Sequence, residues 1–149
     1  MNVRLNLVDL LVAMTITALL VLSLLPLATV TYRTMAVEQG AEELARELQA
    51  ARQLAVASNY TYDVVFDSIA QAYYVKPGDM HAPGRRIQLP PGVEWVTFPQ
   101  QRISFYQSGR CNLGCTITLG HRDSDYRVKV ILATHSGRVR VERGSTNGP

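Results

Sequence analysis

Charged side chains are missing from one long part of this chain, and lysine and glycine are scarce in its first third. No Asp, Glu, Lys or Arg occurs between Asp9 and Arg33, and no glycine precedes Gly40. Lys76 and Lys129 are the two lysines among fifteen basic residues, so the net charge of +3 comes almost wholly from arginine. Arginine favours forked contacts with carboxylate or phosphate groups.

The motifs of common enzyme classes are absent as well. The sequence has no glycine-rich phosphate loop, no Gly-x-Ser-x-Gly context around a serine, and no His/Glu spacing of a metalloprotease. The triplet His121-Arg122-Asp123 matches the start of a kinase catalytic loop, but a chain of 149 residues cannot hold that fold. We interpret the triplet as a charged turn and the protein as non-enzymatic, with no cofactor.

The uncharged run, residues 10–32, is long enough to cross a membrane as a helix. At about 1.5 Å per residue it covers roughly 35 Å, and a hydrocarbon core is about 30 Å thick. The positive-inside rule puts Met1 and Arg4 in the cytoplasm and the residues after Tyr32 outside it. The sequence therefore predicts a single-pass protein of the cytoplasmic membrane with an extracytoplasmic head.

A cleaved secretory signal peptide is the alternative interpretation of this run, with a cleavage site near Pro26-Leu27-Ala28. The run exceeds the roughly 7–15 apolar residues of such a peptide, and helical patterning resumes directly after it. These two features favour a segment that is retained in the mature protein.

A second helical segment, residues 33–58, has an amphipathic pattern. Its apolar residues recur at alternating steps of four and three, which places them on one helix face. They are Val37, Ala41, Leu44, Leu48, Ala51 and Ala55. We expect this face to pack on the rest of the chain, as part of one long helix that begins at Leu5. Pro26 removes a backbone hydrogen bond inside the apolar half and predicts a local kink.

The remaining residues, 59–149, are predicted to form a β-rich head with a loose tail from Gly144. Apolar and polar residues alternate along short segments separated by Pro/Gly turns, which is typical of antiparallel strands. We expect pairs between residues 60–66 and 72–76, 102–106 and 116–119, and 126–133 and 138–143, with further strands at 86–89 and 93–98. About 120 residues outside the apolar run have room for one modest core, so the predicted fold class is α+β.

Cys111 and Cys115 enclose a short turn, Asn112-Leu113-Gly114, between two predicted strands. Outside the cytoplasm, a disulfide that closes this loop is the natural interpretation. A zinc site needs about four ligands, and only His121 and His135 offer themselves, so we expect no metal. Free thiols are the remaining possibility.

The last predicted hairpin gathers basic side chains on one surface. If Val128 and Val130 face the core, then the residues that alternate with them face outward, and the same holds around Val139 in the partner strand. Directly opposed residues share a face, so an even-length turn collects the outward basic residues together. They are Arg127, Lys129, Arg138 and Arg140, with Arg143 following near the flexible tail.

The helix opens with Leu5-Asn6-Leu7-Val8-Asp9-Leu10-Leu11, and Pro26 lies further along it. This arrangement resembles the type IV pilin-like proteins, in particular the minor pseudopilins. Members of that family have a short basic leader, a prepilin peptidase cut with N-terminal methylation, and a Phe-Thr-Leu-Ile-Glu-like motif that opens a long helix before a β-sheet head. The resemblance puts Asp9 in the place of the motif's acid and Pro26 in that of a common helix-kinking proline. It implies a leader of residues 1–4 and an assembly helix of residues 5–32.

One position departs from the family pattern. The family's peptidase cuts after a glycine, whereas Arg4 precedes Leu5 here. In the family, the acid pairs with the positively charged amine that cleavage creates on a neighbouring subunit. Asp9 keeps the negative charge of the family's glutamate on a side chain that is one methylene shorter. An ionised group in a bilayer is costly and tends to be retained for a partner. The alternative is an acid that reaches the interface and favours the helix macrodipole.

Three stretches of the head resemble a narrower group: residues 87–93, residues 103–109, and Ser136-Gly137-Arg138-Val139-Arg140. They are similar to the GspH/FimT-type minor pseudopilins of type II secretion and type IV pili, and to the D-type competence pseudopilin of Gram-positive bacteria. In some FimT-like minor pilins a Gly-Arg-x-Arg motif is linked to DNA binding, and Gly137-Arg138-Val139-Arg140 matches it. The match implies sequence-independent contacts with DNA phosphates.

Three functions follow from these features. The first is a minor pseudopilin, a structural subunit that inserts in the membrane and enters or primes a type II secretion or type IV pilus-like filament. Its partners would be other pilin subunits and prepilin peptidase. The second is a DNA-binding minor pilin or competence pseudopilin for DNA uptake in transformation. The third is an anchored extracytoplasmic domain that never polymerises. We favour the first.

Overall fold

The computed structural model describes residues 7–78, 83–100 and 102–144, without the side chains of residues 22–28. The chain divides into two compact units, residues 1–32 and residues 33–149. The described residues form one helix, α1 (Leu7–Ser58), and two antiparallel sheets. The predicted α+β fold class is therefore confirmed.

In the first unit, α1 exposes its described side chains from residue 7 to residue 21. Leucine and alanine, which favour helices, are frequent in this segment. Its threonines bond within the helix, since the Thr15 hydroxyl donates to the Val12 carbonyl at 2.8 Å and the Thr17 hydroxyl to the Ala13 carbonyl at 2.9 Å. These two threonines thus satisfy their hydroxyl groups within the helix, and the segment presents a largely apolar surface.

Within the part of the chain that the structure describes, no helix is long and apolar enough to cross a membrane.

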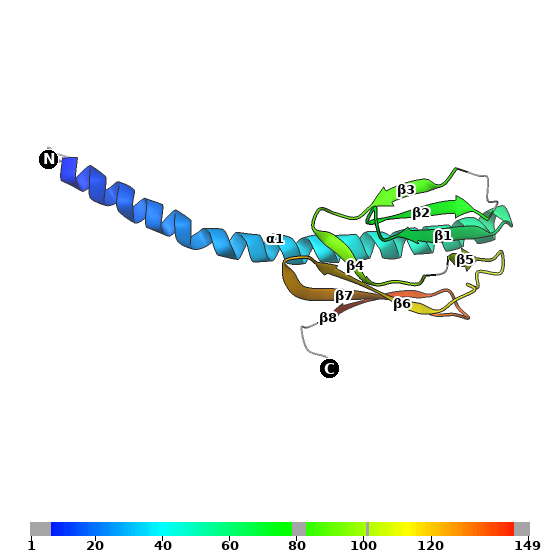
Figure 1. Cartoon of the computed structure of the whole chain (residues 1–149). Helices are drawn as coiled ribbons and strands as arrows, with labels where there is room; N and C mark the ends of the chain where they lie inside the picture. The colour runs from blue at the N-terminus through cyan, green and yellow to red at the C-terminus, as the bar shows by residue number, and fades with distance from the viewer. Residues whose placement is uncertain (1–6, 79–82, 101, 145–149) are drawn as a thin grey trace. The chain divides into compact units, whose positions relative to one another are not determined.

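In the second unit, the strands form two four-stranded sheets (Figure 1). Sheet A has the strand order β3-β2-β1-β5, and sheet B has the order β4-β6-β7-β8. The strands are β1 (Tyr62–Asp67), β2 (Ala72–Pro77), β3 (Arg85–Gln88), β4 (Val93–Thr97), β5 (Ile103–Phe105), β6 (Cys115–His121), β7 (Ser124–Leu132) and β8 (Val139–Gly144).

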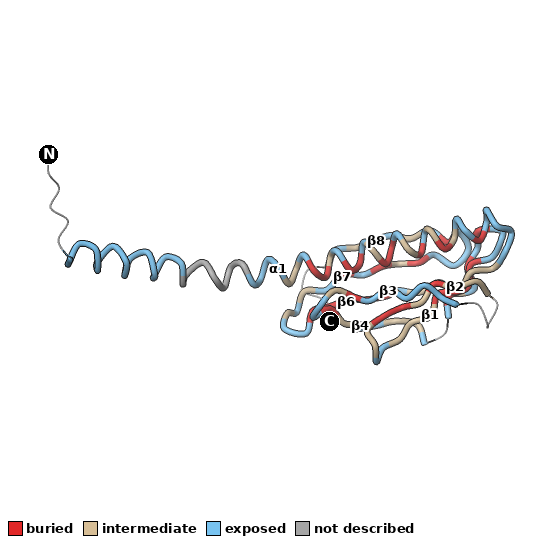
Figure 2. Tube along the Cα trace, turned by 90° about the horizontal axis from the view of Figure 1, so that it is seen from above, coloured by how far each residue is buried: buried red, intermediate tan, exposed pale blue. Residues whose placement is uncertain are grey.

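The predicted apolar face of α1 lies in the centre of the core. All six of its residues, from Val37 to Ala55, have an exposed fraction of 0%, and they share one cluster with buried side chains of both sheets. Figure 2 shows the buried positions recurring along one side of this part of the helix. Gly40 lets the helix approach the loop before β4, because a Cβ at this position would lie 3.2 Å from Cδ of Pro90.

Aromatic rings join the two sheets. Trp95 of β4 packs edge-on against Phe66 of β1, with ring centroids 5.3 Å apart, and against Tyr73 of β2 at 6.1 Å. Aromatic pairs of this kind are worth about 0.5–1.5 kcal/mol beyond the area they bury. Gln71, in the turn between β1 and β2, adds a polar link: its side-chain oxygen accepts a hydrogen bond from the Trp95 amide at 3.1 Å.

Two of the predicted strand pairs are confirmed, since β1 pairs with β2 and β7 pairs with β8. The predicted pair between residues 102–106 and 116–119 is wrong. β5 pairs with β1 in sheet A, whereas β6 pairs with β4 and β7 in sheet B.

Asn112 closes the outer side of β5. Its side-chain oxygen accepts a hydrogen bond from the Ser104 amide at 2.8 Å, and its side-chain amide donates to the Arg102 carbonyl at 3.1 Å. Its backbone amide donates to the Ser104 carbonyl at 3.0 Å. Asn112 thus takes the backbone groups that a further strand would need, which protects this edge of sheet A.

Replacing Leu48 by Ala tests the buried face of α1. Leu48 is fully buried, so the loss of its side chain is expected to lower the free energy of unfolding by about 2–5 kcal/mol. The matched control is Leu54→Ala on the same helix, where the side chain is 46% exposed and we expect a loss of about 1 kcal/mol or less. Urea unfolding followed by Trp95 fluorescence measures both variants. Equal losses would contradict the packing described above.

Candidate functional site

Two acidic residues of α1 are bound by sheet B. The Tyr126 hydroxyl donates to Oε1 of Glu38 at 2.6 Å, and Nη2 of Arg143 donates to Oε1 of Glu42 at 3.0 Å. Nε of Arg143 also lies 3.6 Å from Oε1 of Glu38. The hydrogen bond to Glu38, together with burial, raises the pKa of Tyr126. These contacts attach the polar flank of the helix to β7 and β8.

A further contact lies at the start of the second unit. Nη1 of Arg33 donates to the Asp123 carbonyl at 2.9 Å, and its Nη2 lies 4.0 Å from the Asp123 carboxylate. Asp123 belongs to the turn between β6 and β7, where its amide donates to Nδ1 of His121 at 3.1 Å. Arg122 and Asp123 therefore form the charged turn that the sequence predicts, whereas His121 is the last residue of β6 and is buried.

Three of the predicted basic residues share the outer face of sheet B. In the register of β7 and β8, Arg140 lies opposite Ile131 and Lys129 lies opposite Glu142. Arg127, Lys129 and Arg140 are all exposed. Glu142 lies on the same face, and its Oε1 is 3.4 Å from Nε of Arg140. The face is therefore positive but contains an acidic residue at its centre.

Arg138 lies just before β8, beside a hollow of about 320 Å³. Three polar residues of α1 line the same hollow, namely Gln49, Arg52 and Gln53. Gly137 makes this close packing possible, because its φ is +58° and an added Cβ would lie 2.7 Å from the Gly109 carbonyl oxygen. Nε of Arg52 donates to that same oxygen at 2.9 Å. The fold thus adds a second guanidinium group beside Arg138, which the sequence analysis missed because α1 is remote in the chain.

Arg143 has a different environment from the other predicted basic residues. It lies opposite Val128 in the register, and so on the face of sheet B that packs on α1, where it contacts Glu38 and Glu42. Arg143 was expected near the flexible tail, whereas it lies in β8 with its side chain 63% exposed. β8 includes Gly144, and the rest of the predicted loose tail, residues 145–149, lies outside the described residues.

Cys111 and Cys115 are both free thiols, so the expected disulfide is not formed in the structure. The Cys111 thiol is buried and donates to the Thr134 carbonyl, with Sγ 3.2 Å from the oxygen. Burial raises the pKa of Cys111, and burial with the negative charge of a Cys111 thiolate raises the pKa of Cys115 to about 11. Both thiols are therefore protonated and weakly nucleophilic at neutral pH.

The predicted processing and assembly residues belong to the first unit. Arg4 and Leu5 lie outside the described residues. Asp9 is in the first turn of α1 and is exposed. Pro26 is among residues 22–28, whose side chains are outside the described part, so its predicted kink stays a prediction.

The fold also forms an ion pair that the sequence analysis missed. Asp63 of β1 has a side chain only 4% exposed, and its Oδ2 lies 3.4 Å from Nη1 of Arg102. A hollow of about 360 Å³ adjoins this pair. The sequence signal for this ion pair is the acidic residue Asp63 within an alternating strand pattern. Its partner could not be predicted, because the pairing of β1 with β5 is needed to bring Arg102 close.

Comparisons with known proteins agree with this architecture. The family model described as type II transport protein GspH matches residues 40–137. The chain is similar to the minor pseudopilin EpsH of the type 2 secretion system of Vibrio cholerae, with a TM-score of 0.60 and 15% identity over 72% of this chain and 96% of that one. A second structure of that pseudopilin gives a TM-score of 0.54 and 14% identity, over 76% and 99% of the two chains.

The type IV minor pilin FimU of Pseudomonas aeruginosa is also similar in structure, with a TM-score of 0.57 and 16% identity over 74% of this chain and 89% of that one. No curated protein sequence matches the chain. At such identities the structural matches establish the fold, whereas the family model covers more than half of the chain. The chain therefore belongs to the GspH family of pseudopilins and minor pilins, which are non-enzymatic structural subunits of type II secretion and type IV pilus systems.

Proposed function

We propose that this chain is a minor pseudopilin that inserts in the cytoplasmic membrane through the first half of α1 and enters or primes a pseudopilus or pilus. Other pilin subunits are its partners through that segment. Its head, residues 33–149, lies outside the cytoplasm. The family, whose members are subunits of such filaments, supports the general role.

The apolar surface of the first unit carries the proposal. Leu7, Leu10 and Leu11 are each more than half exposed, and every described side chain of residues 7–21 is exposed as well. Contiguous apolar surface of this extent marks a site of contact with protein or membrane. A lipid bilayer and the helices of neighbouring subunits are the two environments that would cover it.

Asp9 supplies the polar contact for assembly in this proposal. It would form an ion pair with the N-terminal amine of a neighbouring subunit. Because the helices are otherwise apolar in this segment, the ion pair would favour one position of each helix along the axis of its neighbour. The chain's own amine would become available to a neighbour if prepilin peptidase cuts between Arg4 and Leu5. Arg4 replaces the peptidase's usual glycine, so we propose this processing step on the family resemblance alone.

Asp9→Ala tests the assembly contact. We expect the variant to remain in the membrane fraction, because its apolar run is unchanged, but to lose at least about tenfold in cross-linking to its neighbouring subunits. Asp9→Glu is the matched control, since it restores the acid of the family motif, and is expected to cross-link as the unchanged protein does. Undiminished cross-linking of Asp9→Ala would show that the ion pair is not needed.

We propose DNA capture as a second candidate function. The exposed residues Arg127, Lys129 and Arg140 on sheet B support it, as does the hollow that Arg138 shares with Arg52. Guanidinium groups suit phosphate, and the glutamines beside Arg52 can donate further hydrogen bonds to phosphate oxygens. Glu142 weakens this surface, so binding would be salt-sensitive and independent of base sequence.

The double variant Arg138→Ala, Arg140→Ala tests DNA capture. If each arginine contacts one phosphate, the slope of log affinity against log salt falls by about 2. Fluorescence anisotropy of a labelled duplex, titrated with the full chain at several salt concentrations, measures the slope. Arg86→Ala with Arg122→Ala, two exposed arginines elsewhere on the head, is the matched control and should leave it unchanged. An absence of salt-dependent binding, or equal slopes for the two double variants, would refute DNA capture.

A further inference from the structure

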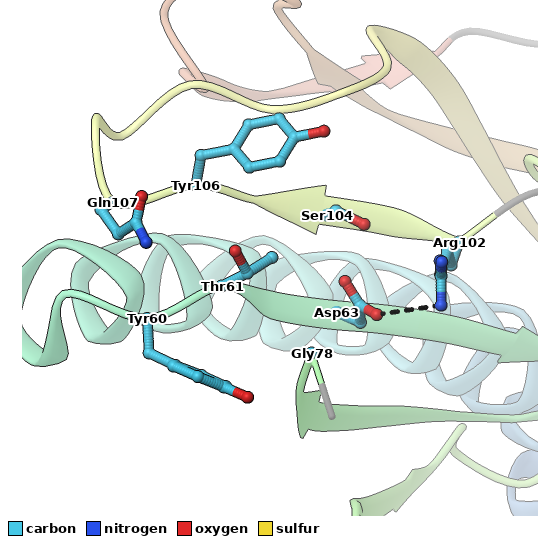
Figure 3. A pocket seen from close by; sticks show the side chains of 8 residues that line it. All are labelled: Tyr60, Thr61, Asp63, Gly78, Arg102, Ser104, Tyr106 and Gln107. Atoms are coloured by element: carbon cyan, nitrogen blue, oxygen red, sulfur yellow. Dashed lines mark ion pairs between the residues drawn. The ribbon is translucent and has the colours of Figure 1, made fainter. Parts of the chain in front are cut away.

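A polar hollow of about 360 Å³ opens beside β1 and β5 of sheet A (Figure 3). Its volume falls at the low end of the range for ligand sites, about 300–1,000 Å³. The side chains that form it include Tyr60, Asp63, Arg102, Ser104, Tyr106 and Gln107. None of these belongs to the assembly segment or to the basic face of sheet B, so the subunit role leaves the hollow unexplained.

Asp63 is the buried charge of the hollow. Its side chain is 4% exposed, while that of its ion-pair partner Arg102 is 51% exposed. Ser104 lies directly opposite Asp63 in the pairing of β1 with β5, and Figure 3 shows the Asp63 carboxylate turned toward Arg102. A buried carboxylate is costly unless it is paired and hydrogen-bonded. The 3.4 Å separation from Arg102 is longer than a charge-assisted hydrogen bond of about 2.7–2.9 Å, so the carboxylate can accept further donors.

The charges of the hollow discriminate against charged ligands. An anion gains little here, because the Asp63 carboxylate already cancels the charge of the Arg102 guanidinium. A divalent metal ion needs several oxygen ligands, and the Arg102 guanidinium beside the one carboxylate disfavours it. An amine would compete with Arg102 for a carboxylate that Arg102 already neutralises. An uncharged ligand rich in hydroxyl groups meets none of these penalties.

We propose that this hollow binds a neutral oligosaccharide. One sugar hydroxyl donates to Asp63 while its neighbour accepts from Arg102, and the Ser104 hydroxyl and the Gln107 amide can each donate and accept. Tyr60 and Tyr106 are 47% and 42% exposed, and Figure 3 shows the Tyr60 ring beyond β1 and the Tyr106 ring beyond β5, at opposite edges of this strand pair. Such rings offer an apolar surface to the C–H face of a sugar together with a hydroxyl for polar contacts.

The test is an NMR titration of the full chain in a detergent without a sugar head group. The probes are chitotriose and maltotriose, each raised to about 10 mM, which detects a dissociation constant in the millimolar range. We expect the amide signals of Ser104 and Gln107 to shift with at least one of the two sugars. Trilysine and inorganic phosphate are the charged comparison probes, and we expect neither to shift these signals.

Two variants separate recognition from folding. Asp63→Asn keeps the size of the buried side chain, and Tyr106→Ala changes an exposed ring that the core does not need; each is expected to weaken sugar binding about tenfold or more. Asp125→Asn, an exposed acid on sheet B, is the matched control and should bind as the unchanged protein does. Sugar-induced shifts absent at the highest concentration, or a stronger response to trilysine or phosphate, would overturn the proposal. So would sugar binding that Tyr106→Ala leaves unchanged.

Discussion

The burial of one face of α1 against two sheets is the contact on which the head depends. Six residues from Val37 to Ala55 lose all their solvent exposure, and the apolar ones with large side chains are each worth about 1.5–3 kcal/mol on burial. Sheets A and B are joined directly by Trp95 and its aromatic neighbours, but both also share the helix in one core cluster. The polar flank of α1 adds Glu38 and Glu42, which Tyr126 and Arg143 bind. The same helix contains Asp9 and the exposed apolar segment, so the element that organises the head is also the one proposed to mediate assembly.

Much of this arrangement follows from local periodicity. Steps of three and four residues predict the buried face of α1, and alternation predicts the hairpins β1–β2 and β7–β8, because both patterns are set by backbone geometry. The pairing of β5 could not be predicted in this way. Its partner β1 precedes it by about forty positions, and the edge is closed by the side chain of Asn112 rather than by a strand. The alternation of apolar and polar residues does not indicate which strand β5 pairs with.

The sequence pattern predicts the environment of some arginines, whereas that of others depends on contacts with residues remote in the chain. Alternation places Arg127 and Arg140 on an exposed face, and the register of β7 and β8 agrees with it. Arg143 faces the helix instead, because the alternation continues through Glu142 and puts it opposite Val128. Arg52 and Arg102 acquire their neighbours through contacts remote in sequence, with the Gly109 carbonyl and with Asp63. The chain's excess of arginine is thus divided between ion pairs that hold the fold and exposed groups available to partners.

In the proposed function, the apolar first half of α1 is retained in the mature protein and used for assembly. The most direct measurement is the N-terminal residue of the protein isolated from membranes, determined by mass spectrometry of its first peptide. We expect a mature chain that keeps Asp9, beginning at Leu5 with a methylated amine if prepilin peptidase accepts Arg4. A mature chain that begins near Thr29 would contradict it, because ordinary secretion would then have removed the segment.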